Sequence, residues 1–197
     1  MKRRLKLNGV LIFIAVVLVA IFPHIFLRRY SFALTAQAVR ISGFSLVLLG
    51  QLLRVSARGH KAENSGNGSQ LIQTGPYALS RNPMYLGILL IGLGIGLALF
   101  KYWVILVFLA IFFARYVKLA FAEEKKLLGV FGNAYADYCR QVPRFLPRMK
   151  LSFAKDIRAV LPLKRPWLYK EIGAIIATLL AAAFFMVWEN IKYFPNH

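Results

Sequence analysis

Two apolar runs separated by a single lysine decide the fold: YLGILLIGLGIGLALF (residues 85–100) and YWVILVFLAIFFARYVKLAFA (residues 102–122). A helix needs roughly 20 apolar residues to cross the hydrocarbon core of a bilayer. The second run has that length, whereas the first is shorter and rich in glycine. The pair therefore predicts two adjacent membrane helices joined by a tight break at Lys101. Three glycines of the first run indicate a face on which another helix packs closely: Gly92, Gly94 and Gly96.

Three further apolar stretches extend this pattern on both sides: residues 7–27, 32–53 and 172–188. The basic flank of the first stretch resembles the start of a signal peptide, but the apolar run is too long and no cleavage motif follows it. We therefore expect an uncleaved first helix. The sequence predicts an all-α integral membrane protein with five transmembrane helices. We divide it into a first helix (1–30), a core with three helices (31–150) and a basic linker with the last helix (151–197).

The composition excludes an ordinary soluble domain. The chain has 197 residues, of which 59% are hydrophobic and 17% charged, and its mean hydropathy is +0.59, whereas soluble domains are about 25% charged. A formal net charge of +19 indicates an anionic partner. Because a nucleic-acid module needs no segments of bilayer length, we expect a lipid bilayer as the partner and no nucleic acid. With the single cysteine Cys139 and three scattered histidines, we expect neither a disulfide framework nor a metal site.

The positive charges are distributed unevenly about the predicted spans. Of the 26 Lys and Arg residues, Arg40 falls inside a span and all but four others fall on one side; those four are Arg28, Arg29, Lys101 and Lys192. Cytoplasmic loops of membrane proteins carry such an excess of Lys and Arg. We therefore expect a cytoplasmic N-terminus and a multi-pass protein of a bacterial or archaeal cell membrane. The basic segment 151–170 is expected to lie along the lipid headgroups.

The segment GPYALSRNPMYLG (residues 75–87) lies where the third span begins on the predicted cytoplasmic side. Gly75 and Pro76 are typical of a turn, and Pro83 suits the first turn of a helix. Such a helix start presents backbone N–H groups and the positive end of the helix dipole, which favour a carboxylate or phosphate group. The alternative is a membrane-entry turn with interfacial tyrosines and an arginine that reaches the headgroups.

Glu123 and Glu124 lie side by side where the fourth span leaves the bilayer. Acidic residues are scarce in this chain, and ionisable groups at this depth are costly and often functional. The alternative is a solvated helix end, in which these two acids pair with Lys125, Lys126 or Arg81.

Taken together, the two segments resemble the signature of a superfamily of membrane methyltransferases that includes isoprenylcysteine carboxyl methyltransferases and phospholipid N-methyltransferases. The resemblance extends from about residue 50 to residue 147. The matching blocks are GPY (75–77), RNPMYLG (81–87), EExxL (123–127), FGxxYxxY (131–138) and VPRFxP (142–147).

This resemblance implies a methyltransferase that binds S-adenosylmethionine in a cytosolic pocket, formed by helix ends and by the segment after the fourth helix. The implied acceptor is amphiphilic or lipid-like, with an apolar tail in the bilayer. A carboxylate such as Glu123 suits the ammonium or ribose hydroxyls of the cofactor. The residues implied in cofactor binding are Gln70, Leu71, Ile72, Tyr77, Asn82, Pro83, Met84, Tyr85 and Glu123.

Three residues are candidates for catalysis. Arg81 and Arg115 are expected to hold an anionic group of the acceptor, and Glu124 is a candidate base for an amine acceptor. Eukaryotic prenylcysteine enzymes have an arginine four residues before the first glutamate, where this chain has Leu119. The sequence therefore leaves open carboxyl O-methylation, phospholipid N-methylation and thiol S-methylation. A non-catalytic basic anchor that binds anionic lipid is the alternative from another class, and nothing in the sequence indicates an oligomeric state.

Overall fold

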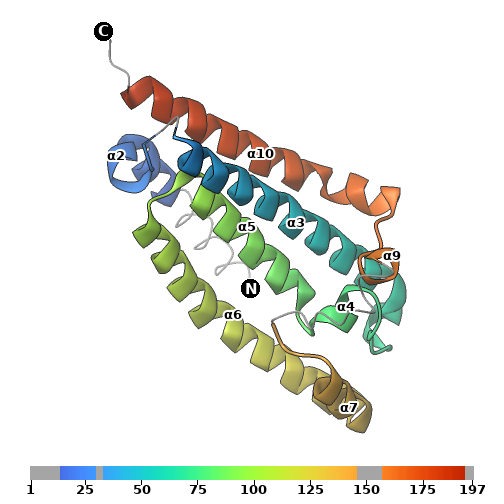
Figure 1. Ribbon diagram of the computed structural model, residues 1–197. Coiled ribbons are helices and arrows are strands. Elements are labelled where there is room, and N and C mark those ends of the chain that lie inside the picture. Colours follow the sequence, from blue (N-terminus) through green and yellow to red (C-terminus); the bar gives the residue numbers. More distant parts are fainter. Residues whose placement is uncertain (1–13, 30–32, 146–156, 194–197) are drawn as a thin grey trace.

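The computed structural model describes residues 14–29, 33–145 and 157–193, and this part of the chain is helical (Figure 1). Residues 14–21 form one helix, and a single isolated bridge joins Leu27 and Phe100. The other helices are α2 (Pro23–Phe26), α3 (Leu34–Asn64), the 3₁₀ turn η1 (Gly66–Gly68), α4 (Pro76–Leu79), α5 (Pro83–Leu99), α6 (Tyr102–Phe131), α7 (Asn133–Gln141), α9 (Ile157–Val160) and α10 (Arg165–Tyr193).

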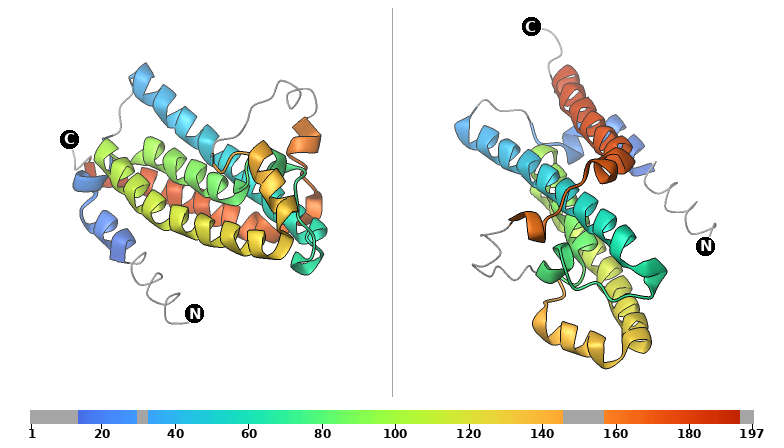
Figure 2. Two further views of the ribbon diagram at one scale, coloured as in Figure 1. Left: turned by 90° about the horizontal axis from the view of Figure 1, so that it is seen from below. Right: turned by 90° about the vertical axis from the view of Figure 1, so that its right-hand side faces the viewer.

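Four long helices form the body of the molecule. In Figure 1, α10, α3, α5 and α6 lie side by side, and α3 and α5 share the most extensive contact. The short helices α4, α7 and α9 gather at one end of this bundle, and α2 lies at the opposite end in both Figure 1 and Figure 2. The sequence blocks on either side of α5 and α6 therefore meet at a single end of the bundle.

The helix bounds confirm the predicted break between the third and fourth spans and correct the first span. Helix α5 ends at Leu99 and α6 begins at Tyr102. The predicted first span, residues 7–27, is not one continuous helix, because the chain leaves helical geometry at Phe22 before Pro23, which has no N–H to continue the helical hydrogen bonds. Its residues before position 14 lie outside the described part, so the prediction of five spans is not tested there.

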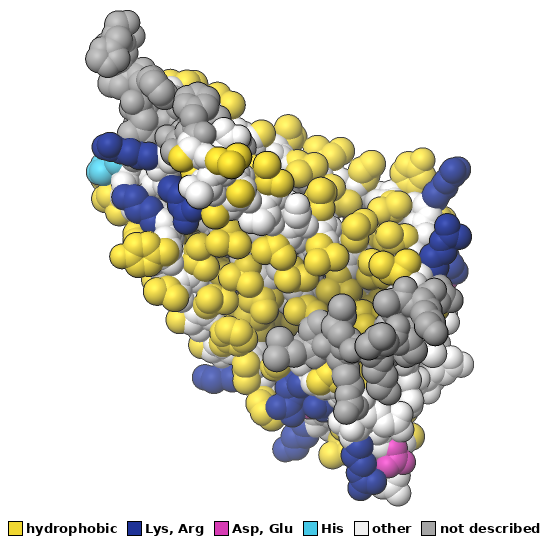
Figure 3. All heavy atoms as spheres, viewed as in Figure 1, with side chains coloured by type: hydrophobic (Ala, Val, Ile, Leu, Met, Phe, Trp, Pro, Cys, Tyr) yellow, Lys and Arg dark blue, Asp and Glu magenta, His cyan; other side chains and the backbone are white. Residues whose placement is uncertain are grey.

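Three described helices are long and apolar enough to cross a membrane: α3, α6 and the part of α10 up to Phe185. Helix α5 is apolar but has 17 residues, a length of about 25 Å that is at the lower limit for a span. Large hydrophobic side chains are exposed along these helices. In Figure 3 they form a broad belt, with Lys and Arg side chains gathered toward the two ends of the face. This surface is that of a membrane protein.

Glycines allow the backbones of α3 and α5 to approach closely. A Cβ atom added at Gly94 would lie 2.5 Å from the carbonyl oxygen of Gly43, and one added at Gly50 would lie 2.7 Å from the carbonyl oxygen of Gly87. No side chain fits at such distances, so these positions require glycine. The close packing predicted from the glycine-rich run is confirmed: Gly94 lies against α3, whereas Gly92 and Gly96 face Phe108 and Ile105 of α6.

The difference in helix length creates a recess at one end of the bundle. Helix α5 has 17 residues, whereas α3 has 31 and α6 has 30. Because Gly87 near the start of α5 packs against Gly50, α3 continues past the start of α5 for about 15 Å. Tyr85 contacts Tyr116, and α6 likewise continues from there to Phe131. The projecting ends of α3 and α6 therefore form two walls above the start of α5.

Helix α10 is joined to α3 by a row of polar contacts. Gln51 Nε2 donates to Thr178 Oγ1 (3.1 Å), and Ser56 Oγ donates to the carbonyl oxygen of Pro162 (2.7 Å). The buried carboxylate of Glu171 pairs with Arg58 at 2.5 Å and with Arg54 at 3.5 Å. These pairings explain why α3 runs on as a helix to Asn64, well beyond the apolar stretch 32–53 that the sequence marks as a span.

We expect Gly94→Ala to destabilise the protein, because the added methyl group would lie 2.5 Å and 2.7 Å from two backbone atoms of α3. Overpacking of this kind costs about 1–3 kcal/mol, and it should appear as a lower midpoint of thermal unfolding in detergent. Gly173→Ala in α10 is the matched control, since its added Cβ has no described atom within 4 Å. Equal midpoints for the two variants would contradict the close contact.

Candidate active site

The turn that begins the GPY segment (residues 75–77) is held from two sides. Gly75 has φ +60°, a conformation that favours glycine, and its missing Cβ would lie 3.0 Å from the ring of His60. His60 Nε2 is 2.9 Å from Thr74 Oγ1, and Tyr138 Oη of α7 donates to the carbonyl oxygen of Tyr77 (2.7 Å). The predicted turn and the predicted helix start at Pro83 are both confirmed.

Glu123 joins three helices at the recess. Its Oε2 accepts a hydrogen bond from Tyr85 Oη of α5 (3.0 Å), and its Oε1 is 3.3 Å from Lys61 Nζ of α3. Its side chain is 37% exposed, so the carboxylate is fixed by these contacts but remains accessible. The two sequence segments that carry the resemblance therefore meet directly, through Tyr85 and Glu123.

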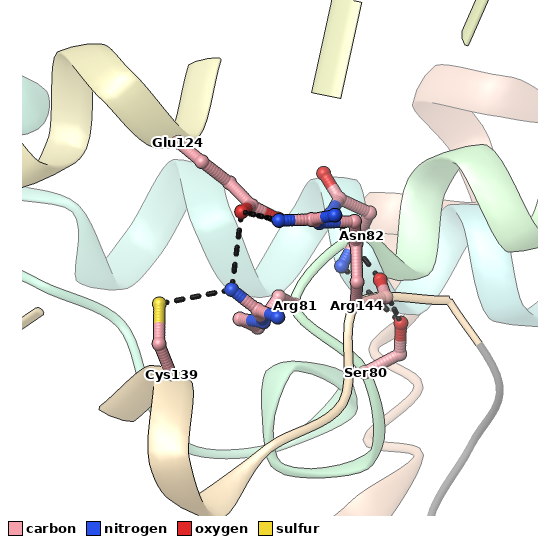
Figure 4. Close-up of polar contacts among 6 residues, drawn as sticks. All are labelled: Ser80, Arg81, Asn82, Glu124, Cys139 and Arg144. Atoms are coloured by element: carbon pink, nitrogen blue, oxygen red, sulfur yellow. Dashed lines mark hydrogen bonds and ion pairs between the residues drawn. The ribbon is translucent and has the colours of Figure 1, made fainter. Parts of the chain in front are cut away.

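Glu124 has a different environment, shown in Figure 4. Arg144 grips it in a bidentate pair, with Nε 2.9 Å from Oε1 and Nη2 2.8 Å from Oε2. Arg81 Nη1 donates to the same carboxylate at 3.1 Å and lies 2.9 Å from Cys139 Sγ. Only 11% of the Glu124 side chain and 13% of the Arg81 side chain are exposed. Glu124 is therefore a buried carboxylate between two guanidinium groups.

The backbone of Arg144 is held as firmly as its side chain. Its carbonyl oxygen accepts hydrogen bonds from Ser80 Oγ (3.0 Å) and Asn82 Nδ2 (3.2 Å), which Figure 4 also shows. Arg81 N donates to the carbonyl oxygen of Pro143 (2.9 Å). We call the set Ser80, Arg81, Asn82, Glu124 and Arg144 the clasp. It fastens the segment after α7 to the start of α5 and to the end of α6 where Glu124 lies.

Two groups of this region, the Arg144 guanidinium and the Tyr138 phenol, have raised pKa values. The hydrogen bond from Arg144 to Glu124 raises the pKa of the Arg144 guanidinium. Burial raises the pKa of the Tyr138 phenol, with nearby Tyr135 and Tyr77 adding to the effect. Arg144 therefore stays charged and Tyr138 stays neutral near neutral pH. One donor is unused, since the buried Arg81 Nε has no hydrogen-bond partner among the described residues.

Two adjoining cavities open onto these groups. The larger has a volume of about 490 Å³, within the roughly 300–1,000 Å³ usual for small-molecule sites. The smaller has about 120 Å³ and lies at the start of α5. Both are lined by Lys61, Tyr77, Arg81, Asn82 and Glu123.

All nine residues that the resemblance implies in cofactor binding line one of these cavities. The larger cavity takes Gln70, Leu71, Ile72, Tyr77, Asn82 and Glu123, and the smaller adds Pro83, Met84 and Tyr85. Of the three catalytic candidates, Arg81 and Glu124 line the larger cavity. Arg115 lies exposed on α6 and lines neither.

The solvated-end alternative is right about one partner of Glu124 and misses another. Arg81 does pair with Glu124, but the second cation is Arg144, and Glu123 pairs with Lys61. Arg144 lies in the VPRFxP block, and this motif could have identified it as a site residue, but the sequence analysis did not include it. Lys61 precedes the first of the matching blocks and carries no such signal. Within the described residues, no three His, Cys, Asp or Glu side chains lie close enough to hold a metal ion.

Comparisons with known proteins match the chain to membrane methyltransferases. Residues 38–134 match the phospholipid methyltransferase family. The chain is 28% identical over 135 residues to the Protein-S-isoprenylcysteine O-methyltransferase of Saccharomyces cerevisiae, a match that covers 64% of this chain and 56% of that protein. It is 30% identical over 114 residues to the enzyme of the same name from Schizosaccharomyces pombe, covering 54% of this chain and 48% of the relative.

A third relative is the cobalt-zinc-cadmium resistance protein CzcN of Cupriavidus metallidurans, 32% identical over 112 residues, or 55% of this chain and 48% of that protein. No solved structure matches the chain significantly. The chain spans about half the length of the curated relatives it matches. The matched segment includes α3, α5 and α6 almost entirely, and these matches support a place for the chain in the superfamily of isoprenylcysteine and phospholipid membrane methyltransferases.

We expect Arg144→Gln to lower stability by roughly 2 kcal/mol, because it removes two charge-assisted hydrogen bonds and leaves the buried Glu124 with one cation fewer. The midpoint of thermal unfolding in detergent measures this. Arg140→Gln is the control, since Arg140 pairs with Asp137 and both side chains are mostly exposed. The clasp would be unimportant to the fold if both variants unfolded together.

Proposed function

We propose that this protein is an S-adenosylmethionine-dependent methyltransferase that acts on an amphiphilic acceptor at the membrane. The observation that carries the proposal is the meeting of the Tyr77 turn and Glu123 on the same two cavities. The two segments touch through the hydrogen bond from Tyr85 to Glu123, two residues that are 38 positions apart in the sequence. A membrane anchor without a ligand has no need to bring these blocks together.

The donor set suits the proposed cofactor. S-adenosylmethionine supplies an electrophilic methyl group on a sulfonium and carries an ammonium, a carboxylate and ribose hydroxyls. Glu123 would accept hydrogen bonds from the ammonium or the hydroxyls, and Tyr85 keeps its carboxylate in position. Tyr77, Asn82 and the segment 70–72 would form the remaining walls.

The apolar walls support an amphiphilic acceptor. The α6 side of the larger cavity is lined by Leu119, Ala122, Leu127, Val130 and Phe131. Methyl transfer from a sulfonium needs alignment of the reacting groups and exclusion of water rather than a metal. Apolar walls exclude water, and they would bind an alkyl or prenyl tail by removing its surface from water.

The charges beside the cavity favour an acceptor that is anionic. Arg81, Arg144 and Glu124 together carry a net charge of +1 when all are ionised, and both oxygens of Glu124 are engaged by guanidinium groups. A carboxylate held in this way is a poor base, which argues against its use on an amine acceptor. We therefore favour carboxyl O-methylation of the isoprenylcysteine type, with Arg81 orienting the acceptor, over N-methylation; S-methylation of a thiolate needs no base and is the second candidate.

The position of Arg115 changes one proposed role, whereas the proposed orientation in the membrane is kept. Arg115 lies outside both cavities, so we assign it no part in holding the acceptor. We retain the proposal that the cavities face the cytoplasm of a bacterial or archaeal cell. It rests on the distribution of Lys and Arg along the chain.

We expect Glu123→Gln to abolish or strongly weaken binding of S-adenosylmethionine without unfolding the protein, because the change removes the charge and keeps the shape. Isothermal calorimetry in detergent measures the binding. Asp137→Asn is the matched control, since it removes one acidic charge from an exposed site on α7. Wild-type affinity in the Glu123→Gln variant would refute the assignment of Glu123.

Release of S-adenosylhomocysteine over a panel of lipid-like acceptors tests the reaction itself. We expect release with an acceptor that combines an apolar tail with a carboxylate or a thiol, and much less with phosphatidylethanolamine. Turnover of the amine acceptor at the highest rate would overturn the preference for an anionic group. A complete lack of release and of cofactor binding would favour the rival, a non-catalytic anchor for anionic lipid.

A further inference from the structure

Lys61 faces the candidate site from outside the sequence blocks that define the superfamily. It lies in the last turn of α3, and its Nζ is 3.3 Å from Glu123 Oε1. It lines both cavities, as Glu123 does. The site therefore contains a cation and an anion side by side, each accessible from the same space.

This ion pair is suited to opening. The side chains of Lys61 and Glu123 are 48% and 37% exposed, and an ion pair that water reaches so easily is weak. Glu123 is also held by Tyr85 through its other oxygen. Lys61 can therefore move away from Glu123 at little cost, while the glutamate remains in position.

We propose that Lys61 and Glu123 together bind the amino-acid end of S-adenosylmethionine, with Lys61 pairing to its carboxylate and Glu123 to its ammonium. This inference rests on the proposed function. The two groups of the ligand are attached to one carbon atom, so their partners must be neighbours of opposite charge. When such a ligand enters, each of the four charges gains neighbours of opposite sign, which strengthens all of the contacts.

The other cations of the site are less suited to the carboxylate. The proposed function assigns Arg81 to the acceptor, and its Nη1 already donates to Glu124. Lys126 lines only the larger cavity, whereas Lys61 also lines the smaller one at the start of α5. The dipole at the start of α5 adds a further attraction for a carboxylate in that cavity.

The turn that carries Lys61 is anchored by residues of the segment 151–197, which we call the C-terminal extension. A Cβ at Gly59 would lie 2.1 Å from the indole of Trp167, so that ring packs directly on the α3 backbone. Trp167 Nε1 donates to Glu63 Oε1 (2.6 Å), and Lys164 pairs with the other oxygen of Glu63. Lys61 therefore projects from a fixed helix end, which reduces the ordering that ligand binding would require.

The test compares two ligands that differ by one carboxylate. Calorimetry in detergent would measure the affinities of S-adenosylmethionine and of its decarboxylated form, which keeps the sulfonium and the amine. We expect wild-type protein to prefer S-adenosylmethionine by roughly tenfold or more, the factor typical of one charge-assisted hydrogen bond. In Lys61→Met we expect the two affinities to be nearly equal, and in Lys61→Arg the preference should be largely kept.

Lys125→Met is the matched control, because Lys125 is exposed on α6 and lines neither cavity; it should keep the wild-type preference. A preference retained by Lys61→Met but lost in Lys126→Met would overturn the inference and assign the carboxylate to Lys126. Equal wild-type affinities for the two ligands would also overturn it. If wild-type protein binds neither ligand, the proposed function itself fails, so the two failures are distinguishable. Thermal unfolding of each variant identifies any change caused by misfolding.

Discussion

The short length of α5 is the constraint on which the site depends. Close contact between glycine backbones fixes α5 against α3. Helix α5 has only 17 residues, whereas α3 has 31 and α6 has 30, so the two longer helices project past the start of α5. A bilayer accommodates all three only if the longer helices extend beyond it at one end. The recess above Pro83 follows from this mismatch. The α4 turn, α7 and the segment after α7 close in around this recess, beside the polar side chains of Lys61, Tyr85 and Glu123 from the three long helices.

The two adjacent glutamates have different tasks because successive residues of a helix point in different directions. Glu124 faces inward, where Arg81 and Arg144 compensate its burial and fasten three segments together. Glu123 is one residue earlier, faces the cavities and is held by Tyr85 and Lys61. Burying a carboxylate is tolerated only when it is fully paired, and here the pairing positions the wall of the cavity that contains Arg81. The fold and the site thus share one set of charges.

The C-terminal extension lies outside the segment that matches the family, yet it contributes to the same end of the bundle. Glu171, Trp167 and the carbonyl group of Pro162 hold the polar half of α3 as a helix. This run buries Val55 and Ala57, and the pairing of Arg54 and Arg58 with Glu171 compensates the charges that lie beside them. The basic residues there serve to position α3, a role that the net charge alone does not indicate.

The sequence by itself determined the apolar helices, the break at Lys101, the turn at Gly75 and the start of α5 at Pro83, because hydropathy and the backbone limits of glycine and proline are local properties. The resemblance also implied nine residues that line the cavities, because they lie in or near its matching blocks, but it did not imply Lys61, which precedes those blocks. The packing of the helices, in contrast, established that Arg144 closes on Glu124, that Lys61 meets Glu123 and that Arg115 lies outside the cavities. Pairings between distant charged residues depend on helix register and rotation, which the packing of α3, α5 and α6 sets and no local pattern encodes.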